Sequence, residues 1–300
     1  MSREEYDSDS SGGSENRSVT EALVLSLSPL TLLELRYDAV MRLPLYQVDA
    51  FASQVFSGNP AAVVPIERSL DDATMQSIAA ENNLSETAFL RWTNDSWEIR
   101  WFTPVCEVDL CGHATLASAW VVFNHLDPAL RSVEFGSKSG ALRVAKLADG
   151  ALELDFPARP AGVCPPHPDL ATGLGGTPRE ILKARDFMAV YESESEVRAL
   201  RPDFPRLARI DVTGIIATAP GDSSDFVSRF FAPASGIDED PVTGSAHCTL
   251  IPYWAARLGK KKLRALQVSK RGGELACELR GDRVGIAGKC APYLEGTITL

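Results

Sequence analysis

Two long apolar segments dominate the pattern of hydrophobic and polar positions along the chain. Residues 114–126 and 246–258 are apolar on nearly every side, whereas a surface helix carries a single apolar stripe. Each segment follows a glycine, Gly112 or Gly244, and is flanked by short apolar runs and turn residues that predict strands. Because a helix of this kind must be enclosed by other elements, the pattern predicts two buried helices, each wrapped by a sheet.

The second half of the chain repeats the first. The strand predicted at residues 100–104 and the helix start at Gly112 correspond to residues 229–233 and the helix start at Gly244. A hairpin predicted at residues 135–144 likewise corresponds to residues 268–277. A unit of this length that occurs twice indicates a duplicated domain. We therefore expect an α+β fold with two pseudo-symmetric halves, residues 41–160 and residues 161–300.

Two further helix starts are predicted outside this repeat. The stretch Ser69-Leu70-Asp71-Asp72 begins one helix, because its acidic and hydroxyl side chains suit an N-cap. At Thr177-Pro178, a capping residue followed by proline in the first helical position predicts a second. Prolines between residues 157 and 178 mark the connection between the halves.

The charge is acidic and unevenly distributed. The whole chain carries a formal net charge of −10, which argues against a nucleic-acid or anionic-membrane partner. Residues 1–40 hold eight acidic and three basic side chains, a net charge of −5, and their polar opening predicts a disordered extension. The apolar stretch at residues 22–33 is shorter than the roughly 20 residues a membrane span needs. We expect a cytoplasmic protein whose folded part starts near Met41.

The cysteine and glycine patterns do not indicate a metal or a nucleotide. Six cysteines occur without a Cys-x-x-Cys pair or a histidine at zinc-finger spacing, so we expect no metal site and mostly reduced, packed thiols. The glycines at residues 173–176 do not fit a dinucleotide or phosphate-loop fingerprint. We therefore expect no cofactor.

Candidate chemistry lies where the two buried helices begin. Unpaired backbone N–H groups point out of a helix start, and two starts that face each other would bind a small carboxylate. The polar side chains near these starts are Asp109, Cys111, His113, Asp238, Glu239, Asp240, Thr243 and Ser245. The alternative is structural, with Asp and Ser capping helices and His113 lying in the interior. Cys111 could also be a reactive thiol, since a helix start lowers the pKa of a thiol.

Glu86 is the candidate general acid/base. It precedes the apolar residues 88–90, so we expect it to be partly buried and able to take and return a proton. The alternative is that Ser85 and Glu86 cap or terminate the preceding helix. Sequence chemistry alone leaves both interpretations open.

Four motifs carry a resemblance to a known family. They are Gly58-Asn59-Pro60-Ala61-Ala62-Val63, Leu84-Ser85-Glu86-Thr87-Ala88-Phe89, Leu110-Cys111-Gly112-His113-Ala114-Thr115 and Glu239-Asp240-Pro241-Val242-Thr243-Gly244-Ser245-Ala246-His247. In this order they resemble the motifs of the PhzF-like, phenazine-biosynthesis family, from about Met41 to Leu300. The stretch Arg271-Gly272-Gly273-Glu274-Leu275 makes the vertebrate MAWD-binding protein subgroup the most similar one.

The resemblance implies a fold, an activity and roles for the site residues. The fold is diaminopimelate-epimerase-like, with each half a sheet rolled around a central helix and the active site in the cleft. The activity is cofactor-free isomerisation, in which Glu86 moves a proton within a small, cyclic or amino-acid-like carboxylic acid. His113, Asp240 and Ser245 hold the substrate and assist protonation. The substrate-binding residues are Gly112, Gly244, Thr243 and Cys111, and a homodimer is common in the family.

Two other functions stay open. A racemase or epimerase of the same fold would use a thiol at each helix start, but the repeat aligns Cys111 with Thr243, which disfavours a two-thiol mechanism. A catalytically silent module with a protein partner is the second option, because the MAWD-binding subgroup is described by such a partner. The joint presence of four residues favours an enzyme, because a pure scaffold needs none of them: Glu86, His113, Asp240 and Ser245.

Overall fold

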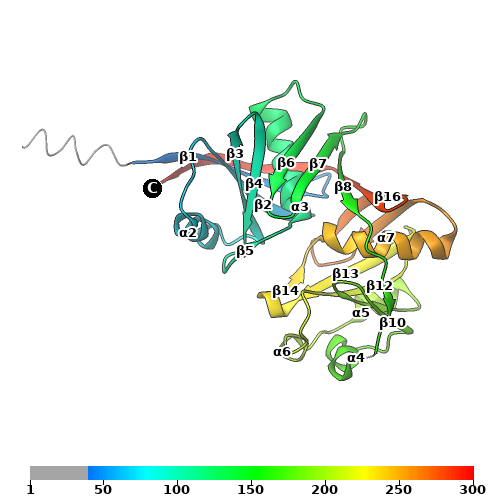
Figure 1. The fold of residues 1–300 in the computed structure, drawn as a ribbon. Coiled ribbons are helices and arrows are strands. Elements are labelled where there is room, and N and C mark those ends of the chain that lie inside the picture. The colour runs from blue at the N-terminus through cyan, green and yellow to red at the C-terminus, as the bar shows by residue number, and fades with distance from the viewer. Residues whose placement is uncertain (1–39, 166) are drawn as a thin grey trace, which may run out of the picture. The chain divides into compact units, whose positions relative to one another are not determined.

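The computed structural model describes residues 40–165 and 167–300, of which Arg42–Thr299 packs as one unit (Figure 1). Apart from Val40, the predicted disordered extension lies outside the described residues. The elements before the connection are β1 (Arg42–Ala50), β2 (Asn59–Ile66), α2 (Asp72–Asn82), β3 (Glu86–Thr93), β4 (Ser96–Phe102), β5 (Glu107–Val108), α3 (Gly112–Val121), the π-helical turn η1 (Val122–Leu126), β6 (Ser132–Ser137), β7 (Gly140–Lys146) and β8 (Leu152–Pro157).

The connection and the second half follow. Their elements are β9 (Gly162–Val163), α4 (Pro168–Leu174), β10 (Glu180–Lys183), β11 (Phe187–Val190), α5 (Glu194–Ala199), α6 (Phe204–Leu207), β12 (Ile215–Pro220), β13 (Phe226–Ala232), the 3₁₀ turn η2 (Pro233–Ser235), β14 (Ile237–Asp240), α7 (Gly244–Leu258), β15 (Lys262–Gln267), β16 (Gly273–Arg280), β17 (Arg283–Gly288) and β18 (Cys290–Thr299).

Strands pair in the same order on both sides of the connection. β2 runs parallel to β3, β3 antiparallel to β4, and β4 parallel to β6, which continues antiparallel through β7 and β8. β11 runs parallel to β12, β12 antiparallel to β13, and β13 parallel to β15, which continues antiparallel through β16 and β17. The parallel steps from β4 to β6 and from β13 to β15 each span a buried helix, α3 or α7.

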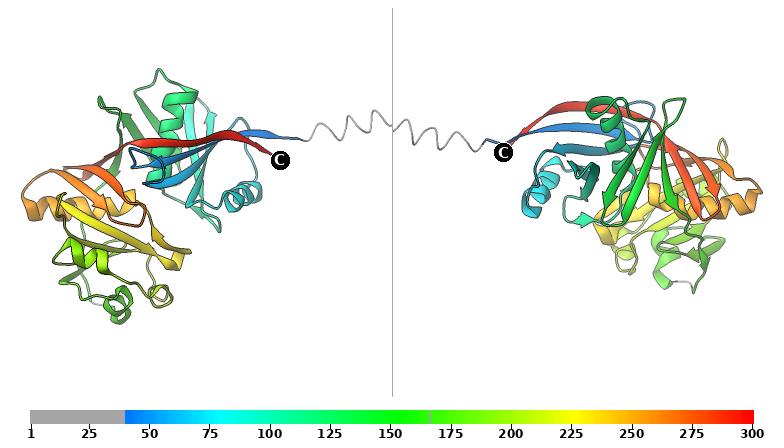
Figure 2. Two further views of the ribbon diagram at one scale, coloured as in Figure 1. Left: turned by 180° about the vertical axis from the view of Figure 1, so that it is seen from behind. Right: turned by 45° about the horizontal axis from the view of Figure 1, so that its top comes forward.

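Two strand pairings join the halves. β8 pairs antiparallel with β17, so one sheet continues from the first half into the second. The last strand, β18, leaves the second half and pairs antiparallel with β1, with one irregularity at Gln47 and Val48. Figure 2 shows this return, with the red C-terminal strand lying beside the blue first strand.

The two predicted central helices are present. α3 contacts β1, β2, β3 and β8, and only Trp120 on it is not fully buried. α7 contacts β15, β16 and β17 and is buried through its first turns. Its last turn, Ala256–Leu258, is exposed, so the prediction of burial on nearly every side is wrong there. The helix ends at Gly259, whose positive φ of 66° forms the left-handed cap.

One predicted helix is absent from the described residues. Thr177 and Pro178 start no helix, and Glu180–Lys183 forms β10, which pairs with β9 and β11. Pairing with these two neighbouring strands outweighs the local capping pattern at Thr177 and Pro178. Leu182 is the fully buried residue of this strand. The proline-first helix is instead α4, which Pro168 begins after His167.

The helix start predicted near Ser69 is confirmed. α2 begins after Asp71, whose side chain accepts a hydrogen bond from the backbone N–H of Thr74. The helix ends at Asn83, a left-handed residue with a φ of 49°. Glu86 is the first residue of β3, so the alternative that Ser85 and Glu86 cap or terminate the helix is wrong. Among the described residues, no helix is long and apolar enough to cross a membrane.

Candidate active site

The backbones of α3 and α7 approach each other closely at the glycine that begins each helix, Gly112 or Gly244. A Cβ added to Gly112 would lie 3.1 Å from the Cα of Gly244, and one added to Gly244 would lie 3.3 Å from the Cα of Gly112. Neither start is capped by a side chain from the part of the chain that the structure describes. The first-turn N–H groups of both helices are therefore available to a negatively charged ligand.

Glu86 and His113 form the buried ion pair of this site. β3 pairs with the central strands β2 and β4, and its first side chain, Glu86, is only 8% exposed. Its Oε2 lies 3.0 Å from His113 Nε2 on the first turn of α3. This Oε2 receives no aligned hydrogen bond from another described residue. The contact is electrostatic, and the carboxylate stays open to a proton donor.

Asn59 links the histidine to the second half of the chain. Its Nδ2 lies 2.7 Å from Asp240 Oδ1, 3.0 Å from the Val242 carbonyl oxygen and 3.0 Å from His113 Nδ1. An amide nitrogen only donates, so Nδ1 of His113 faces a donor, and the hydrogen of the neutral ring belongs on Nε2, toward Glu86. With two hydrogens for three neighbours, Asn59 must share one of them.

Asp240 is buried at the end of β14 and held by hydrogen bonds. Its carboxylate accepts from Asn59 Nδ2 and from the hydroxyl of Thr243. Burial raises the pKa of Asp240 to about 6, opposed by His113 and by these hydrogen bonds and reinforced by Glu86. A carboxyl group with such a pKa can hold or release a proton near neutral pH.

The ionisation of His113 and Cys111 follows from the same surroundings. Burial lowers the pKa of His113, but the acidic groups of Cys111 and Glu86 together outweigh burial and raise it well above its usual value. Burial raises the pKa of the Cys111 thiol to about 11, and Glu86 acts in the same direction. Cys111 is therefore a neutral thiol at pH 7, so at this pH the contribution to the raised pKa of His113 comes from Glu86 and not from Cys111. The expectation that the helix start lowers the pKa of Cys111 is wrong, because burial and Glu86 outweigh the effects that lower it, the largest of which is the charge of His113.

All the predicted site residues line one cavity of about 490 Å³. These residues are Glu86, Cys111, Gly112, His113, Asp240, Thr243, Gly244 and Ser245. Arg159 and Arg185 line the same cavity. Arg185 makes an ion pair of 3.0 Å with the buried Asp186 and donates a hydrogen bond of 3.1 Å to Ser245 Oγ. The cavity therefore combines buried acid/base groups with uncapped helix starts and two guanidinium groups.

A family model described as phenazine biosynthesis-like protein matches residues 48–296. The chain belongs to this family. It is 54% identical over 261 residues to an uncharacterized isomerase of Pseudomonas aeruginosa, covering 87% of this chain and 100% of that protein. A human phenazine biosynthesis-like domain-containing protein is 41% identical, with 86% and 100% covered.

Solved structures agree with the family assignment. A PhzF-family protein of Enterococcus faecalis has a TM-score of 0.83 and 48% identity, with 87% of this chain and 100% of that chain covered. A hydroxyproline epimerase of Agrobacterium vitis has a TM-score of 0.57 at 12% identity, which shows a shared fold, with 86% of this chain and 93% of that chain covered. The predicted class of enzyme, an isomerase with an unidentified substrate, fits these relatives.

Three donors of this PhzF-family site are close enough to be considered as metal ligands. One atom each of Glu86, Cys111 and His113 lies within 4.8 Å of the other two. A metal ion binds the thiolate, whereas burial raises the pKa of Cys111 to about 11. Nδ1 of His113 also faces the donor of Asn59. The protonated thiol and the donor facing Nδ1 therefore disfavour binding of one metal ion by all three residues.

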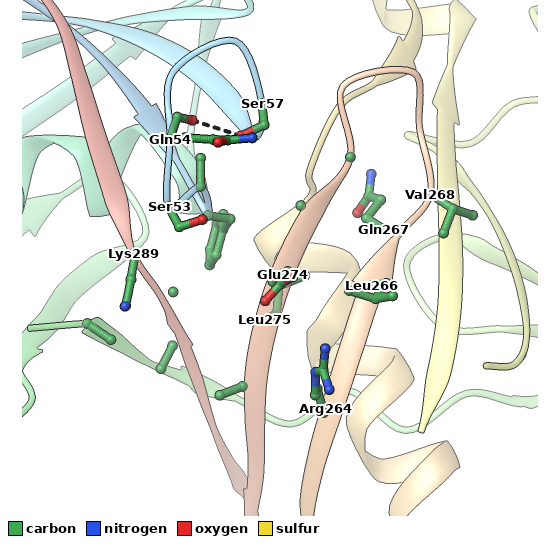
Figure 3. A pocket seen from close by; sticks show the side chains of 18 of the residues that line it. Ser53, Gln54, Ser57, Arg264, Leu266, Gln267, Val268, Glu274, Leu275 and Lys289 are labelled. Atoms are coloured by element: carbon green, nitrogen blue, oxygen red, sulfur yellow. Dashed lines mark hydrogen bonds between the residues drawn. The ribbon is translucent and has the colours of Figure 1, made fainter. Parts of the chain in front are cut away.

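A larger cavity of about 670 Å³ contains none of the predicted site residues. Figure 3 shows its wall of β15 and β16, with Arg264 and Gln267 on one strand and Glu274 on the other, opposite the loop that carries Ser53 and Gln54. Gln267 connects this wall to the active site. Its amide accepts from the Thr243 backbone N–H and donates to the Asp240 carbonyl oxygen, both at 2.8 Å. The cavity is therefore bordered by a residue that supports the loop before α7.

Sequence reasoning missed several residues of the site. Asn59 stood in a quoted motif, Gly-Asn-Pro, yet received no role, because its partners, His113 and residues 240–242, come from two distant segments. Gln267 and Arg185 gave no motif signal. Arg159 lies among the prolines of the connection, where loop composition hid its position on the cavity wall.

Proposed function

We propose that the protein is a cofactor-independent isomerase that moves a proton within a small, cyclic or amino-acid-like carboxylic acid, with Glu86 as the general acid/base. The observation that carries this proposal is the buried Glu86 carboxylate, 3.0 Å from His113 Nε2 on the wall of the cavity. A carboxylate so held can remove a proton from carbon and return it to a neighbouring carbon. The relatives named as isomerases support the same reaction class.

The remaining site residues would bind the acid and stabilise charge. The backbone N–H groups at Gly244 and Ser245, with those beside Gly112, would receive the substrate carboxylate between the helix starts. Thr243 and Cys111 would border it. His113 and Asp240 would assist protonation, since the pKa of Asp240 is raised to about 6. Ser245 Oγ, which accepts from Arg185, would position the substrate.

Isotope exchange tests the role of Glu86. Wild-type protein and Glu86→Gln would be incubated in heavy water with a panel of cyclic and α-amino carboxylic acids, and deuterium uptake at carbon would be read by mass spectrometry. We expect uptake with the wild type and at least a 100-fold loss in the variant, the scale of a removed general base, about 10²-fold or more.

Glu98→Gln is the matched control. Glu98 pairs with Arg91 on the neighbouring strand, and its side chain is 43% exposed. This variant should exchange deuterium like the wild type. Equal exchange by wild type and Glu86→Gln would reject Glu86 as the base, and exchange by neither with any acid would favour a protein-binding module.

The alternatives differ in how well the site supports them. A racemase based on Cys111 needs a thiolate, and burial raises the pKa of that thiol to about 11, so the site supports it less well than the Glu86 mechanism. We keep a homodimer and a protein partner as predictions from the family resemblance, and a cytoplasmic location as a prediction from the sequence. Placement in the MAWD-binding subgroup rests on the stretch Arg271–Leu275. The repeated order of strand pairings supports two pseudo-symmetric halves, divided near residue 160.

A further inference from the structure

A proline inside α7 leaves a helix carbonyl oxygen free to bind the segment that follows β8. Pro252 has no N–H, so it cannot donate to the Cys248 carbonyl oxygen four residues earlier in the helix. The backbone N–H of Arg159 donates to this oxygen at 2.8 Å. The segment that follows β8 is thereby tied to the helix, and the tie uses the backbone of Arg159 and leaves its side chain available.

Arg159 lines the cavity, and no acidic side chain among the described residues pairs with it. Arg159 is partly buried and lines the cavity, yet its side chain makes no hydrogen bond or ion pair within residues 40–165 and 167–300. Burial raises the pKa of the Cys248 thiol to about 11, while Arg159 and Arg185 act in the opposite direction. The positive charges of Arg159 and Arg185 are therefore both felt at Cys248, near the start of α7.

The acidic groups of the cavity have other partners. Glu107 pairs with Arg100 and Lys138, and Asp240 is held by Asn59 and Thr243. Glu86 lies against His113, and Asp186, which does not line the cavity, binds Arg185. Asp109 lies on the exposed rim and forms no ion pair with Arg159 among the described residues. The positive charge of Arg159 is thus available to a ligand.

We propose that Arg159, beside Arg185, binds a second anionic group of the substrate, so that the site takes small molecules with two negative groups. One carboxylate lies at the starts of α3 and α7, and a second carboxylate or a phosphonate lies at Arg159. The proposal rests on the proposed function for the first of these positions. A volume of about 490 Å³ accommodates such a ligand, and a planar guanidinium binds carboxylate and phosphate groups in the same bidentate way.

Calorimetric titration of the full chain with matched acids tests the subsite. The probes are butyrate and benzoate as monoacids, succinate, glutarate and phthalate as diacids, and 3-phosphonopropionate as the phosphonate arm. We expect at least one dianion to bind more tightly than its monoacid by a factor of about ten or more, because the second anionic group gains a charge-assisted contact. The comparison of carboxylate with phosphonate identifies the second group.

Variants separate the subsite from the carboxylate position at the helix starts. Arg159→Met should remove the advantage of the dianion and leave monoacid affinity unchanged, whereas Arg159→Lys should retain part of the advantage. Both substitutions keep the backbone N–H that binds Cys248. Arg179→Met, which removes a surface arginine paired with Glu192, should change neither affinity.

Several results would overturn the proposal. These are dianions that bind no more tightly than monoacids, no binding by any dianion, or an equal loss of monoacid and dianion affinity in Arg159→Met. Failure of the proposed function looks different, since Glu86→Gln would then leave carbon exchange unchanged while the preference for dianions persists.

Discussion

At the scale of residues, the site is a chain of polar contacts that crosses both halves of the molecule. Glu86 lies against His113, whose other ring nitrogen faces Asn59, and Asn59 donates to Asp240. Residue types and motifs were sufficient to nominate Glu86, His113 and Asp240. Asn59 could not be given a role, because the need for a donor between a ring nitrogen and a carboxylate arises only once β2, α3 and β14 come together.

Asn59 should restrain the protonation of His113. The Glu86 carboxylate favours imidazolium, whereas a donor at Nδ1 opposes the second ring proton. We therefore expect Asn59→Leu to raise the pKa of His113 further, by about one unit, equivalent to about 1.4 kcal/mol. The measurement is a pH titration of the ring ¹⁵N resonances, which is practicable because the chain has four histidines.

His247 provides an internal control for this titration. Its Nδ1 lies 2.8 Å from the Thr243 carbonyl oxygen, so Nδ1 carries the hydrogen, and burial lowers the pKa of His247 to about 4. His247 should keep this tautomer and remain neutral at pH 7 in both proteins. An unchanged or lowered pKa of His113 in Asn59→Leu would show that Asn59 has only a packing role.

At the scale of elements, the decisive feature is the close approach of two helix starts. The apolar segments and their preceding glycines predicted α3 and α7, because burial on most sides and a helix start leave a strong local signal. The helix predicted at Thr177 failed, because pairing of Glu180–Lys183 with two neighbouring strands outweighs a capping pattern. The role of Pro252 was also hidden, since its consequence is a contact with the distant Arg159.

Gly112→Ala should separate the helix starts and weaken carboxylate binding. The new Cβ would lie 3.1 Å from the Cα of Gly244, and this neighbour is backbone that cannot rotate away. We expect a loss of about 1–3 kcal/mol in stability from overpacking, offset by up to about 1 kcal/mol of helix propensity. Monoacid affinity should fall as well, measured by titration calorimetry alongside thermal unfolding.

Gly136→Ala is the matched control, because its Cβ would lie 3.7 Å from the Trp97 carbonyl oxygen, an ordinary contact. Its stability and monoacid affinity should remain close to wild type. Unchanged affinity in Gly112→Ala would show that the spacing of the two helix starts does not determine carboxylate binding.

At the scale of the whole molecule, the halves are joined more extensively than the repeat suggested. The duplication indicated two halves, but a repeat carries no information about which strands pair across it. β8 and β17 form six residue pairs, and β18 and β1 form nine. The site lies between helix starts from both halves, so its geometry depends on this joint packing.

The joined sheets should make the two halves unfold together. Ile286 on β17 is fully buried and lies opposite Leu154 on β8, so Ile286→Ala leaves a cavity at the junction that costs about 2–5 kcal/mol. We expect one calorimetric transition in the wild type and one in the variant, at a lower temperature, with equal calorimetric and van't Hoff enthalpies. The unfolding temperature followed by tryptophan fluorescence should fall by the same amount, even though four of the five tryptophans lie before residue 160, in the half that does not contain Ile286.

Val163→Ala is the control, because this side chain is 91% exposed, and it should leave the transition unchanged. Two separate transitions, or a calorimetric shift without the fluorescence shift, would show that the halves unfold independently and that the β8–β17 junction does not couple them.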